Sequence, residues 1–215
     1  MQANPLSSKL PSIAVLVSGN GSNLQALIDA KANGTLHANI VLVLSNKASA
    51  FALERAKAAH IKAVCVPHTS FATREAFDAE VVTQLRQHDV EWVVFAGFMR
   101  LITNVLLDAY PNRILNLHPS LLPAFPGANA IEQAIEYGVK VTGCSVHLVT
   151  REMDSGPIVD QSVVPVHSTD TVETLAARIH QAEHQLLVRC VQAAVTGRLR
   201  VSTRGARSVV HVEHA

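Results

Sequence analysis

The stretch Ile13–Leu24, with the sequence IAVLVSGNGSNL, decides how the fold begins. The uninterrupted apolar run Ile13–Val17 is typical of a strand that helices cover on both faces, as in a parallel sheet. The glycine-containing segment Gly19–Asn23 follows at once, and apolar residues then recur at helical spacing from Leu24 to Ile28. The stretch therefore predicts a strand, a tight turn and a helix, in that order.

Apolar runs and helix-period segments continue to alternate along the chain. Four further runs of strand length are Ile40–Leu44, Ala63–Val66, Trp92–Ala96 and Arg113–His118. Helices between such runs predict parallel strands joined by crossovers, with helices on both faces. The fold class expected is therefore α/β, with a Rossmann-like open sheet that is parallel in its N-terminal half.

The pattern changes after Gly138, which is expected to stop a short helix over Ile131–Tyr137. Two longer runs, Val141–Val149 and Ile158–Val166, predict antiparallel strands that extend the sheet. A D-x-x-E start signal at Asp170 predicts a helix that runs to about Thr196. The remaining residues, 198–215, are polar and are expected to form a loose extension.

The composition is typical of a single domain and argues against several classes of binding partner. The chain has 215 residues, 48% of them hydrophobic, and a formal net charge of +1. This balance excludes a disordered chain and leaves no basic excess for nucleic acid, so no nucleic-acid partner is expected. Neither a leader nor a membrane-spanning run is found, and the three cysteines form no C-x-x-C pair. A cytoplasmic protein without membrane contact is expected.

The segment Gly19–Asn23 is a candidate anion site. It lies between a strand and a helix, where backbone N–H groups at a helix N-terminus can hold an anion. It lacks both the third glycine of a dinucleotide fingerprint and the lysine of a P-loop, so a monophosphate fits better than a pyrophosphate. The alternative is that Ser22 and Gln25 merely form a capping box.

Asn116 and His118 are the candidate catalytic pair. Lying two residues apart on the predicted fifth strand, they point to the same face, at the carboxyl end where α/β sheets bind ligands. An amide can stabilise a developing oxyanion and an imidazole can move a proton near neutral pH. The proline-rich segment Pro119–Pro126 follows, and a long irregular loop of this kind is usually functional. The alternative is a polar pair that faces solvent.

Asp154 lies in the turn between the two predicted antiparallel strands, which could bring it to the same place. A carboxylate beside His118 would raise the pKa of the imidazole and keep it protonated. The alternative is an aspartate that serves only the geometry of its own turn.

The string His180–His184 has the H-x-x-E-H pattern of an inverted zinc-protease motif. A zinc hydrolase using His180, Glu183 and His184 is therefore an alternative, although no third ligand at a recognisable spacing accompanies them. The remaining histidines are expected to be solvated; they include His37, His60, His68 and His88.

Several of these segments together resemble one family. They are IAVLVSGNGSNL, LSNK at 44–47, AGFMR at 96–100, ILNLHPSLLP at 114–123, GCSVHLV at 143–149 and DSGP at 154–157. In this order the chain is similar to the phosphoribosylglycinamide formyltransferases, folate-dependent enzymes of purine synthesis. The HPSLLP and DSGP segments are shared with other formyltetrahydrofolate enzymes, whereas GNGSN favours the glycinamide ribonucleotide enzyme.

The resemblance implies a role for each matching residue. Asn116, His118 and Asp154 would be catalytic, with Asn116 stabilising the oxyanion and His118 acting as general acid. The glycinamide ribonucleotide would be bound by Gly21, Ser22, Asn23, Pro119, His180, Gln181, Ala182 and Glu183. The cosubstrate 10-formyltetrahydrofolate would be bound by Arg74, Met99, Arg100, Leu101, Ile102, Asn116, Thr150, Arg151, Glu152, Met153 and Asp154. No metal is implied, because the nucleotide then accounts for the H-x-x-E-H string.

The resemblance also implies one formyltransferase domain over residues 1–215. Residues 12–110 would form a nucleotide-binding half and 111–200 a catalytic and folate-binding half, with 1–11 and 201–215 as terminal extensions. A monomer or a homodimer is expected. Asn129 stands where the family often has histidine, and Leu122–Pro123 is a candidate cis bond. The alternatives left open are a formyltetrahydrofolate hydrolase, a formyltransferase for another amine and a non-catalytic nucleotide-binding module.

Overall fold

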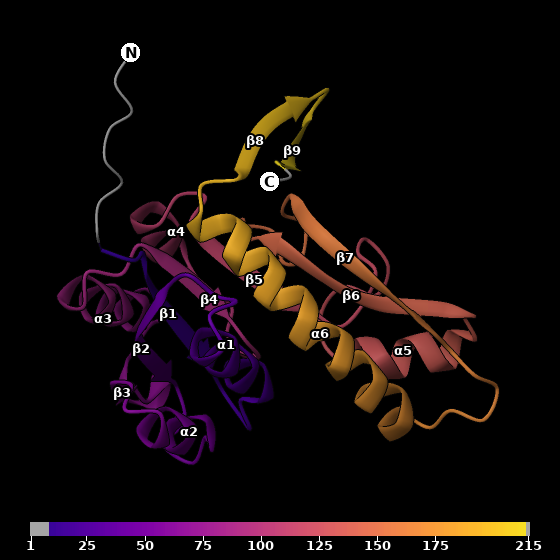
Figure 1. Cartoon of the computed structure of the whole chain (residues 1–215), viewed down its shortest axis with the longest axis horizontal. Helices are drawn as coiled ribbons and strands as arrows, with labels where there is room; N and C mark the ends of the chain where they lie inside the picture. Colours follow the sequence, from indigo (N-terminus) through magenta and orange to yellow (C-terminus); the bar gives the residue numbers. More distant parts are fainter. Residues whose placement is uncertain (1–8, 214–215) are drawn as a thin grey trace.

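The computed structural model of the chain describes residues 9–213, and seven of its strands form one mixed sheet (Figure 1). The strand order is β3-β2-β1-β4-β5-β6-β7. The strands are β1 (Ser12–Val17), β2 (Asn39–Ser45), β3 (Ala63–Cys65), β4 (Trp92–Phe95), β5 (Ile114–His118), β6 (Val141–Leu148) and β7 (Ile158–Pro165). The first five pair in parallel, and β6 is antiparallel to both of its neighbours. The predicted fold class is confirmed.

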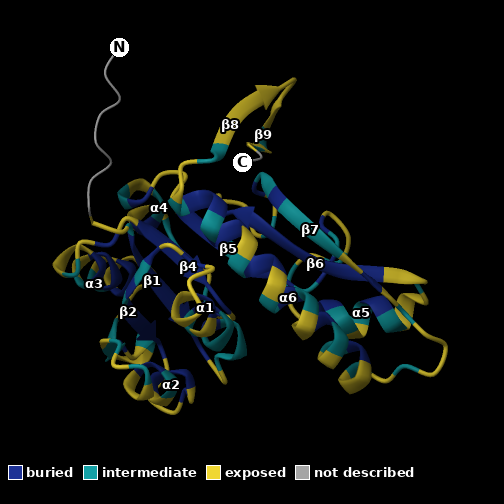
Figure 2. Ribbon diagram, viewed as in Figure 1, coloured by how far each residue is buried: buried dark blue, intermediate teal, exposed yellow. Residues whose placement is uncertain are grey.

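Helices cover both faces of this sheet, as the buried runs predict. They are α1 (Ser22–Ala32), α2 (Ala52–Ala58), α3 (Arg74–Gln87), α4 (Asn104–Ala109), α5 (Ala130–Tyr137) and α6 (Val172–Val195), with a 3₁₀ turn, η1, at His68–Ser70. Alternate residues of β1 enter two cores: Val15 packs in the core that includes α1 and α6, and Leu16 in the core that includes α3 and α4. The central strands of the sheet, such as β1 and β4, are accordingly buried, whereas β3 and most of β7 at its edges are half-buried (Figure 2).

The loose extension expected after Arg198 is wrong. The tail forms a hairpin of β8 (Leu199–Arg204) and β9 (Arg207–Val212), which stands out from the body beside β7 (Figure 1). Leu199, Val210 and Val212 pack against the core beneath α6, whereas most of the hairpin is exposed. The hairpin thus contacts the larger core through three apolar side chains spaced along a polar segment.

The start of α6 also differs by one residue from the prediction. Thr171, not Asp170, is the N-cap, and it forms a capping box with Thr174. Asp170 binds Arg178 instead, at 2.7 Å. The end of the helix, with Thr196 as C-cap, is as predicted.

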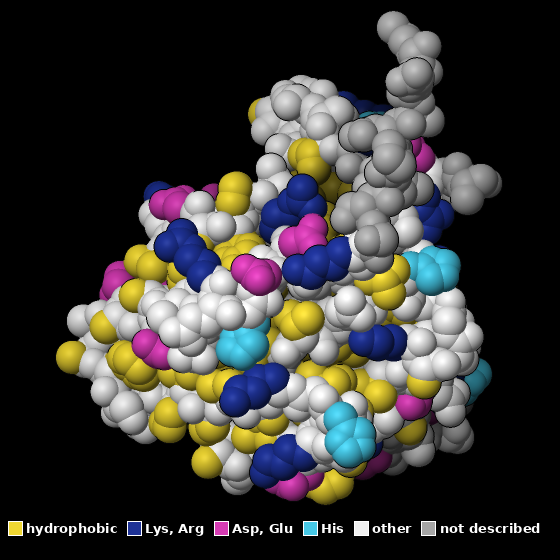
Figure 3. Space-filling model, turned by 60° about the vertical axis from the view of Figure 1, so that its left-hand side comes forward, with side chains coloured by type: hydrophobic (Ala, Val, Ile, Leu, Met, Phe, Trp, Pro, Cys, Tyr) yellow, Lys and Arg dark blue, Asp and Glu magenta, His cyan; other side chains and the backbone are white. Residues whose placement is uncertain are grey.

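Other expectations can be compared directly with the described residues. The Leu122–Pro123 bond is cis, as suggested. None of the helices within residues 9–213 has the length and apolar content that a membrane crossing requires. Basic and acidic side chains are intermixed on the visible face in Figure 3, which fits the near-zero net charge. Residues 1–8 of the expected N-terminal extension, and 214–215 of the C-terminal one, lie outside the described residues.

The strand order reverses between β1 and β4, which lie next to each other at the centre of the sheet. Parallel strands end at the same edge, so the loops that follow β1, β4 and β5 lie side by side. In open α/β sheets, ligands bind in the crevice at such a switch point. The segments Gly19–Asn23 and Gly97–Ile102 and the residue His118 all belong to this edge.

Candidate active site

The loop after β1 leaves the N-terminus of α1 open. Gly21 is the N-cap, in the left-handed region at φ +78°, and no side chain caps the helix. The alternative, a capping box between Ser22 and Gln25, is therefore not formed, because the Gln25 side chain binds Asp29 and Arg55 instead. The first N–H groups of α1 and the positive end of the helix dipole remain free for an anion.

Glu183 of α6 connects this loop to the H-x-x-E-H segment. It is 4% exposed, and one of its oxygens accepts from Asn23 Nδ2 at 3.0 Å and lies 2.8 Å from His180 Nδ1. The Glu183 carboxylate raises the pKa of His180 above its usual range, against the opposing effect of burial. The structure thus brings Ser22 and Asn23 together with His180 and Glu183, the residues predicted to bind the nucleotide.

Ser18 joins the loop after β1 to the loop after β4. Its backbone N–H donates to the Gly97 carbonyl oxygen at 3.0 Å, and its hydroxyl accepts from the Met99 N–H at 2.8 Å. The same hydroxyl donates to Asn46 Oδ1 at 2.6 Å. Both Ser18 and Asn46 are buried, so these bonds fix the relative position of the two loops.

Apart from Asn116 on β5, the residues predicted for the folate lie on three segments: the loop after β4, the start of α3 and the Thr150–Asp154 loop. Met99 is 75% exposed and Leu101 56%, which is unusual for large apolar side chains and fits surfaces that contact a ligand. The Arg100 guanidinium lies over the Phe77 ring, 5.5 Å from the ring centre. Phe77 belongs to α3, one helical turn after Arg74. The Thr150–Asp154 loop is the third segment, and its Arg151 binds Asn104 at the start of α4.

The three predicted catalytic side chains meet. Asn116 Nδ2 lies 3.4 Å from Asp154 Oδ1, and His118 Nδ1 lies 3.5 Å from Asp154 Oδ2. The Asp154 and His118 side chains are 9% and 6% exposed. The two strand residues share one face of β5, and the turn that carries Asp154 folds over that face. A donor amide, an imidazole and a carboxylate therefore line one largely buried site.

Glycine allows Asp154 to come this close. A Cβ at Gly156 would overlap the Leu148 carbonyl oxygen of β6, so the DSGP turn can lie on the strand only with glycine at this position. Asp154 itself adopts φ +50°, a left-handed conformation in which aspartate and asparagine are enriched. The turn thus holds a strained backbone in order to present its carboxylate.

Both ring nitrogens of His118 face oxygen acceptors. Nδ1 faces Asp154, and Nε2 lies 2.8 Å from the carbonyl oxygen of Phe125 in the proline-rich loop. Because a carbonyl oxygen only accepts, Nε2 donates to the Phe125 carbonyl oxygen, and this bond turns Nδ1 toward Asp154. The loop Pro119–Pro126 therefore orients the His118 ring.

The Asp154 carboxyl is held in its charged form. Burial by itself would raise its pKa, but the neighbouring His147 side chain, the hydrogen bond from the Gly127 N–H and the neighbouring His118 side chain bring the pKa below its ordinary value. The Gly127 N–H donates to Asp154 Oδ2 at 2.8 Å. The proline-rich loop and the DSGP turn are thereby joined through one carboxylate.

His147 is the residue that the sequence reasoning missed. It lies opposite Asn116 in the β5–β6 pairing and is 1% exposed. Its Nε2 lies 3.1 Å from Asn116 Nδ2 and 3.6 Å from Asp154 Oδ1, while its Nδ1 lies 3.0 Å from the Leu148 carbonyl oxygen. The signal was a histidine within the apolar run Val141–Val149, a position that requires buried polar partners.

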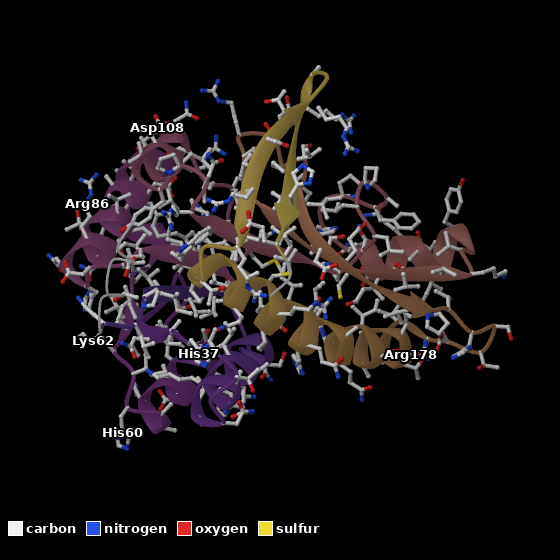
Figure 4. The ribbon with its side chains drawn as sticks, turned by 45° about the horizontal axis from the view of Figure 1, so that its top comes forward. His37, His60, Lys62, Arg86, Asp108 and Arg178 are labelled. Atoms are coloured by element: carbon white, nitrogen blue, oxygen red, sulfur yellow. The ribbon has the colours of Figure 1, made fainter. Side chains whose placement is uncertain are left out.

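The other histidines divide between surface and structural positions. His37 and His60 are exposed, and His60 points away from the body (Figure 4). His68 was also expected to be solvated, but it is half-buried, and its Nδ1 lies 3.2 Å from Asn46. Within residues 9–213, no three His, Cys, Asp or Glu side chains are grouped to hold a metal ion.

Asn129 has a conformational role in this chain. It is the N-cap of α5 with φ +59°, and its side chain makes no capping hydrogen bond. Asparagine populates this left-handed region more readily than most residues. Gly127 lies two residues before Asn129 and directly follows the proline-rich loop. A Cβ on Gly127 would lie 3.4 Å from Met153, so this end of the loop lies close to the Thr150–Asp154 loop.

The chain is similar in sequence to known proteins over about nine tenths of its length. It is 41% identical over 194 residues to phosphoribosylglycinamide formyltransferase of Escherichia coli, covering 90% of this chain and 92% of that protein. It is 43% identical over 194 residues to the trifunctional purine biosynthetic protein adenosine-3 of Chironomus tentans, but it spans only 14% of that much longer protein.

Solved structures give the same result. The crystal structure of glycinamide ribonucleotide transformylase 1 from Symbiobacterium toebii superposes with a TM-score of 0.92 and 42% identity, and 98% of each chain is covered. The family model described as formyl transferase matches residues 12–191. A match over most of the chain, together with a shared fold and shared sequence, shows that this chain belongs to the formyl transferase family.

Proposed function

We propose that the chain is a phosphoribosylglycinamide formyltransferase. It transfers the formyl group of 10-formyltetrahydrofolate to the amine of 5-phosphoribosylglycinamide, giving formylglycinamide ribonucleotide and tetrahydrofolate in purine biosynthesis. The observation that carries the proposal is the meeting of Asn116, His118 and Asp154 beside an open helix N-terminus at the same sheet edge. Relatives with this name that match nearly end to end support it.

The nucleotide binds between α1 and α6. The N–H groups of Gly21, Ser22 and Asn23 hold its 5′-phosphate at the helix N-terminus. The ribose lies toward Glu183, which accepts a hydrogen bond from Asn23, and toward His180, which contacts Glu183. Gln181, Ala182 and Pro119 complete the nucleotide site at its margins.

The folate binds where exposed apolar side chains lie beside backbone polar groups. Met99, Leu101 and Ile102 contact the pterin from the loop after β4, and the Thr150–Asp154 loop covers its other side. Arg74 and Arg100 lie close to the same surface and attract the anionic tail of the cosubstrate. This placement leaves the formyl group next to β5.

The transfer itself is direct. The glycinamide amine attacks the formyl carbon, and negative charge develops on the formyl oxygen, where the Asn116 amide and the protonated His118 stabilise it. Asn116 Nδ2 makes two contacts, at 3.1 Å with His147 Nε2 and at 3.4 Å with Asp154 Oδ1. The contact with Asp154 is the longer and weaker one, and its N–H donates to the formyl oxygen instead. As the bond from carbon to N10 breaks, His118 or a water held by Asp154 passes the proton lost by the amine to N10.

Purified chain tests this proposal in one steady-state assay. Folate turnover is measured with and without glycinamide ribonucleotide, and formation of the formylated nucleotide is followed in parallel. We expect turnover only when the nucleotide is present. Equal turnover without the nucleotide would show a formyltetrahydrofolate hydrolase, and binding without turnover would show a nucleotide-binding module.

Three narrower expectations accompany the function. The protein acts in the cytoplasm as a monomer or a homodimer, on small molecules alone. Size-exclusion chromatography with light scattering distinguishes the two assemblies. The division into a nucleotide-binding half, 12–110, and a catalytic and folate-binding half, 111–200, predicts that substitutions in the Gly19–Asn23 loop of the first half raise the KM for the nucleotide.

A further inference from the structure

Arg55 contacts the loop that follows β1, and each of its three guanidinium nitrogens donates a hydrogen bond to this loop or to α1. It comes from α2, and its Nε donates to the Asn20 carbonyl oxygen at 2.9 Å. Nη2 donates to Asn20 Oδ1 at 2.8 Å, and Nη1 donates to Gln25 Oε1 at 3.1 Å. One guanidinium thus binds both the loop and the first helical turns of α1.

The backbone around Arg55 fits the loop just as closely. The Ala52 N–H donates to the Gly19 carbonyl oxygen at 3.2 Å. A Cβ on Gly21 would lie 2.6 Å from Ala52 Cβ, so the loop packs on α2 with no room for a side chain. The Arg55 guanidinium also lies 5.0 Å above the ring of Phe51. Its position is therefore fixed from several sides.

The charge of Arg55 has no direct counterion. All three acceptors are neutral, and among residues 9–213 no carboxylate forms an ion pair with it. The Asp29 carboxylate is reached only through Gln25, whose Nε2 donates to it at 2.9 Å. A fixed and uncompensated positive charge beside an open helix N-terminus raises the local affinity for an anion.

We infer that Arg55 is a positioning residue for the 5′-phosphate of the nucleotide. It holds the loop Gly19–Asn23 in its anion-binding shape and supplies the positive charge that the loop itself lacks. The inference rests on the proposed function, since it assumes that this loop holds the phosphate of the substrate. It predicts that Arg55 matters for substrates that carry a phosphate and not for the chemical step.

The test compares four proteins: the wild type, Arg55→Ala, Arg55→Lys and Lys57→Ala. Lys57 is the matched control, because it lies on the same helix and carries the same charge but, among the described residues, pairs only with the exposed Glu54. Each protein is assayed with glycinamide ribonucleotide and with its dephosphorylated riboside, and inorganic phosphate serves as a competing probe.

We expect Arg55→Ala to raise the KM for the ribonucleotide by about tenfold to a hundredfold, the range for losing charge-assisted hydrogen bonds. The kcat should stay within about threefold, because the chemistry lies on β5. The KM for the riboside should not change, and inhibition by phosphate should weaken. Arg55→Lys should restore part of the phosphate inhibition but not the full KM, since lysine keeps the charge without the fork.

Three results would overturn the inference while leaving the proposed function intact. They are an unchanged ribonucleotide KM in Arg55→Ala, an equal rise for the riboside, and an equal rise in Lys57→Ala. If wild-type protein does not formylate the ribonucleotide at all, the proposed function fails first. Should Arg55→Ala not fold, as judged by circular dichroism, Arg55→Lys and Arg55→Gln decide the same points.

Discussion

Replacing Asp154 by asparagine removes one charge from the site with almost no change in shape. Asparagine has the size of aspartate and tolerates the φ of +50° found here, so the turn should survive. The carboxylate lies 3.5 Å from His118 Nδ1, and both side chains are less than a tenth exposed. An ion pair at about 4 Å in a partly buried site is worth about 4 kcal/mol.

That energy sets the size of the expected effect. If the whole of it were lost from the transition state, kcat would fall about 10³-fold, because 1.36 kcal/mol corresponds to a factor of ten. Solvent and the remaining contacts of the ring recover part of it, so we expect a fall of about 10² to 10³. The KM values should change little, because neither substrate depends on Asp154 alone.

The assay is formyl transfer under saturating substrates, beside the matched variant Asp108→Asn. Asp108 is an exposed carboxylate on α4, at the periphery of the molecule (Figure 4). It controls for the loss of one negative charge far from the site. A kcat for Asp154→Asn within about threefold of wild type would refute the reasoning that the carboxylate supports the acid.

Three further predictions concern other parts of the site. His147→Gln should lower kcat by about tenfold with unchanged KM values, because His147 fixes the Asn116 amide. A lower kcat accompanied by a clear fall in melting temperature would instead indicate a structural role. Gly21→Ala should destabilise the fold by about 1–3 kcal/mol and raise the nucleotide KM, whereas Gly34→Ala, with φ +79° but open space around it, should show the backbone cost alone in thermal melts. The raised pKa of His180 means that its charge, present at low pH, persists above the usual range and is lost as the pH rises through that pKa. The nucleotide KM should therefore rise on the alkaline side, and a His180→Gln variant with the same pH profile would contradict this.

Much of the fold could be predicted because the strands of its parallel half are uninterrupted apolar runs. Ile13–Val17 and its successors leave few alternatives to a covered parallel sheet, and the structure places each within two residues of the prediction. The C-terminal hairpin could not be predicted in this way. Its two strands are mostly polar, and only contact with an already formed core decides that they pair.

The candidate site divides along a similar line. Asn116 and His118 could be predicted because strand alternation places residues two apart on one face, at a known ligand-binding end. His147 could not, since its role depends on the register between β5 and β6 that sets it opposite Asn116. The role of Arg55 is harder still to predict from the sequence, because its contact with Asn20 joins α2 to the loop after β1.

The most direct test of the account follows the formyl group itself. Purified chain is incubated with glycinamide ribonucleotide and 10-formyltetrahydrofolate that carries an isotope label in its formyl carbon, and the products are analysed by mass spectrometry. The account predicts that the label appears in formylglycinamide ribonucleotide, with one tetrahydrofolate released for each label transferred. Label recovered as free formate, or left on the folate, would contradict it.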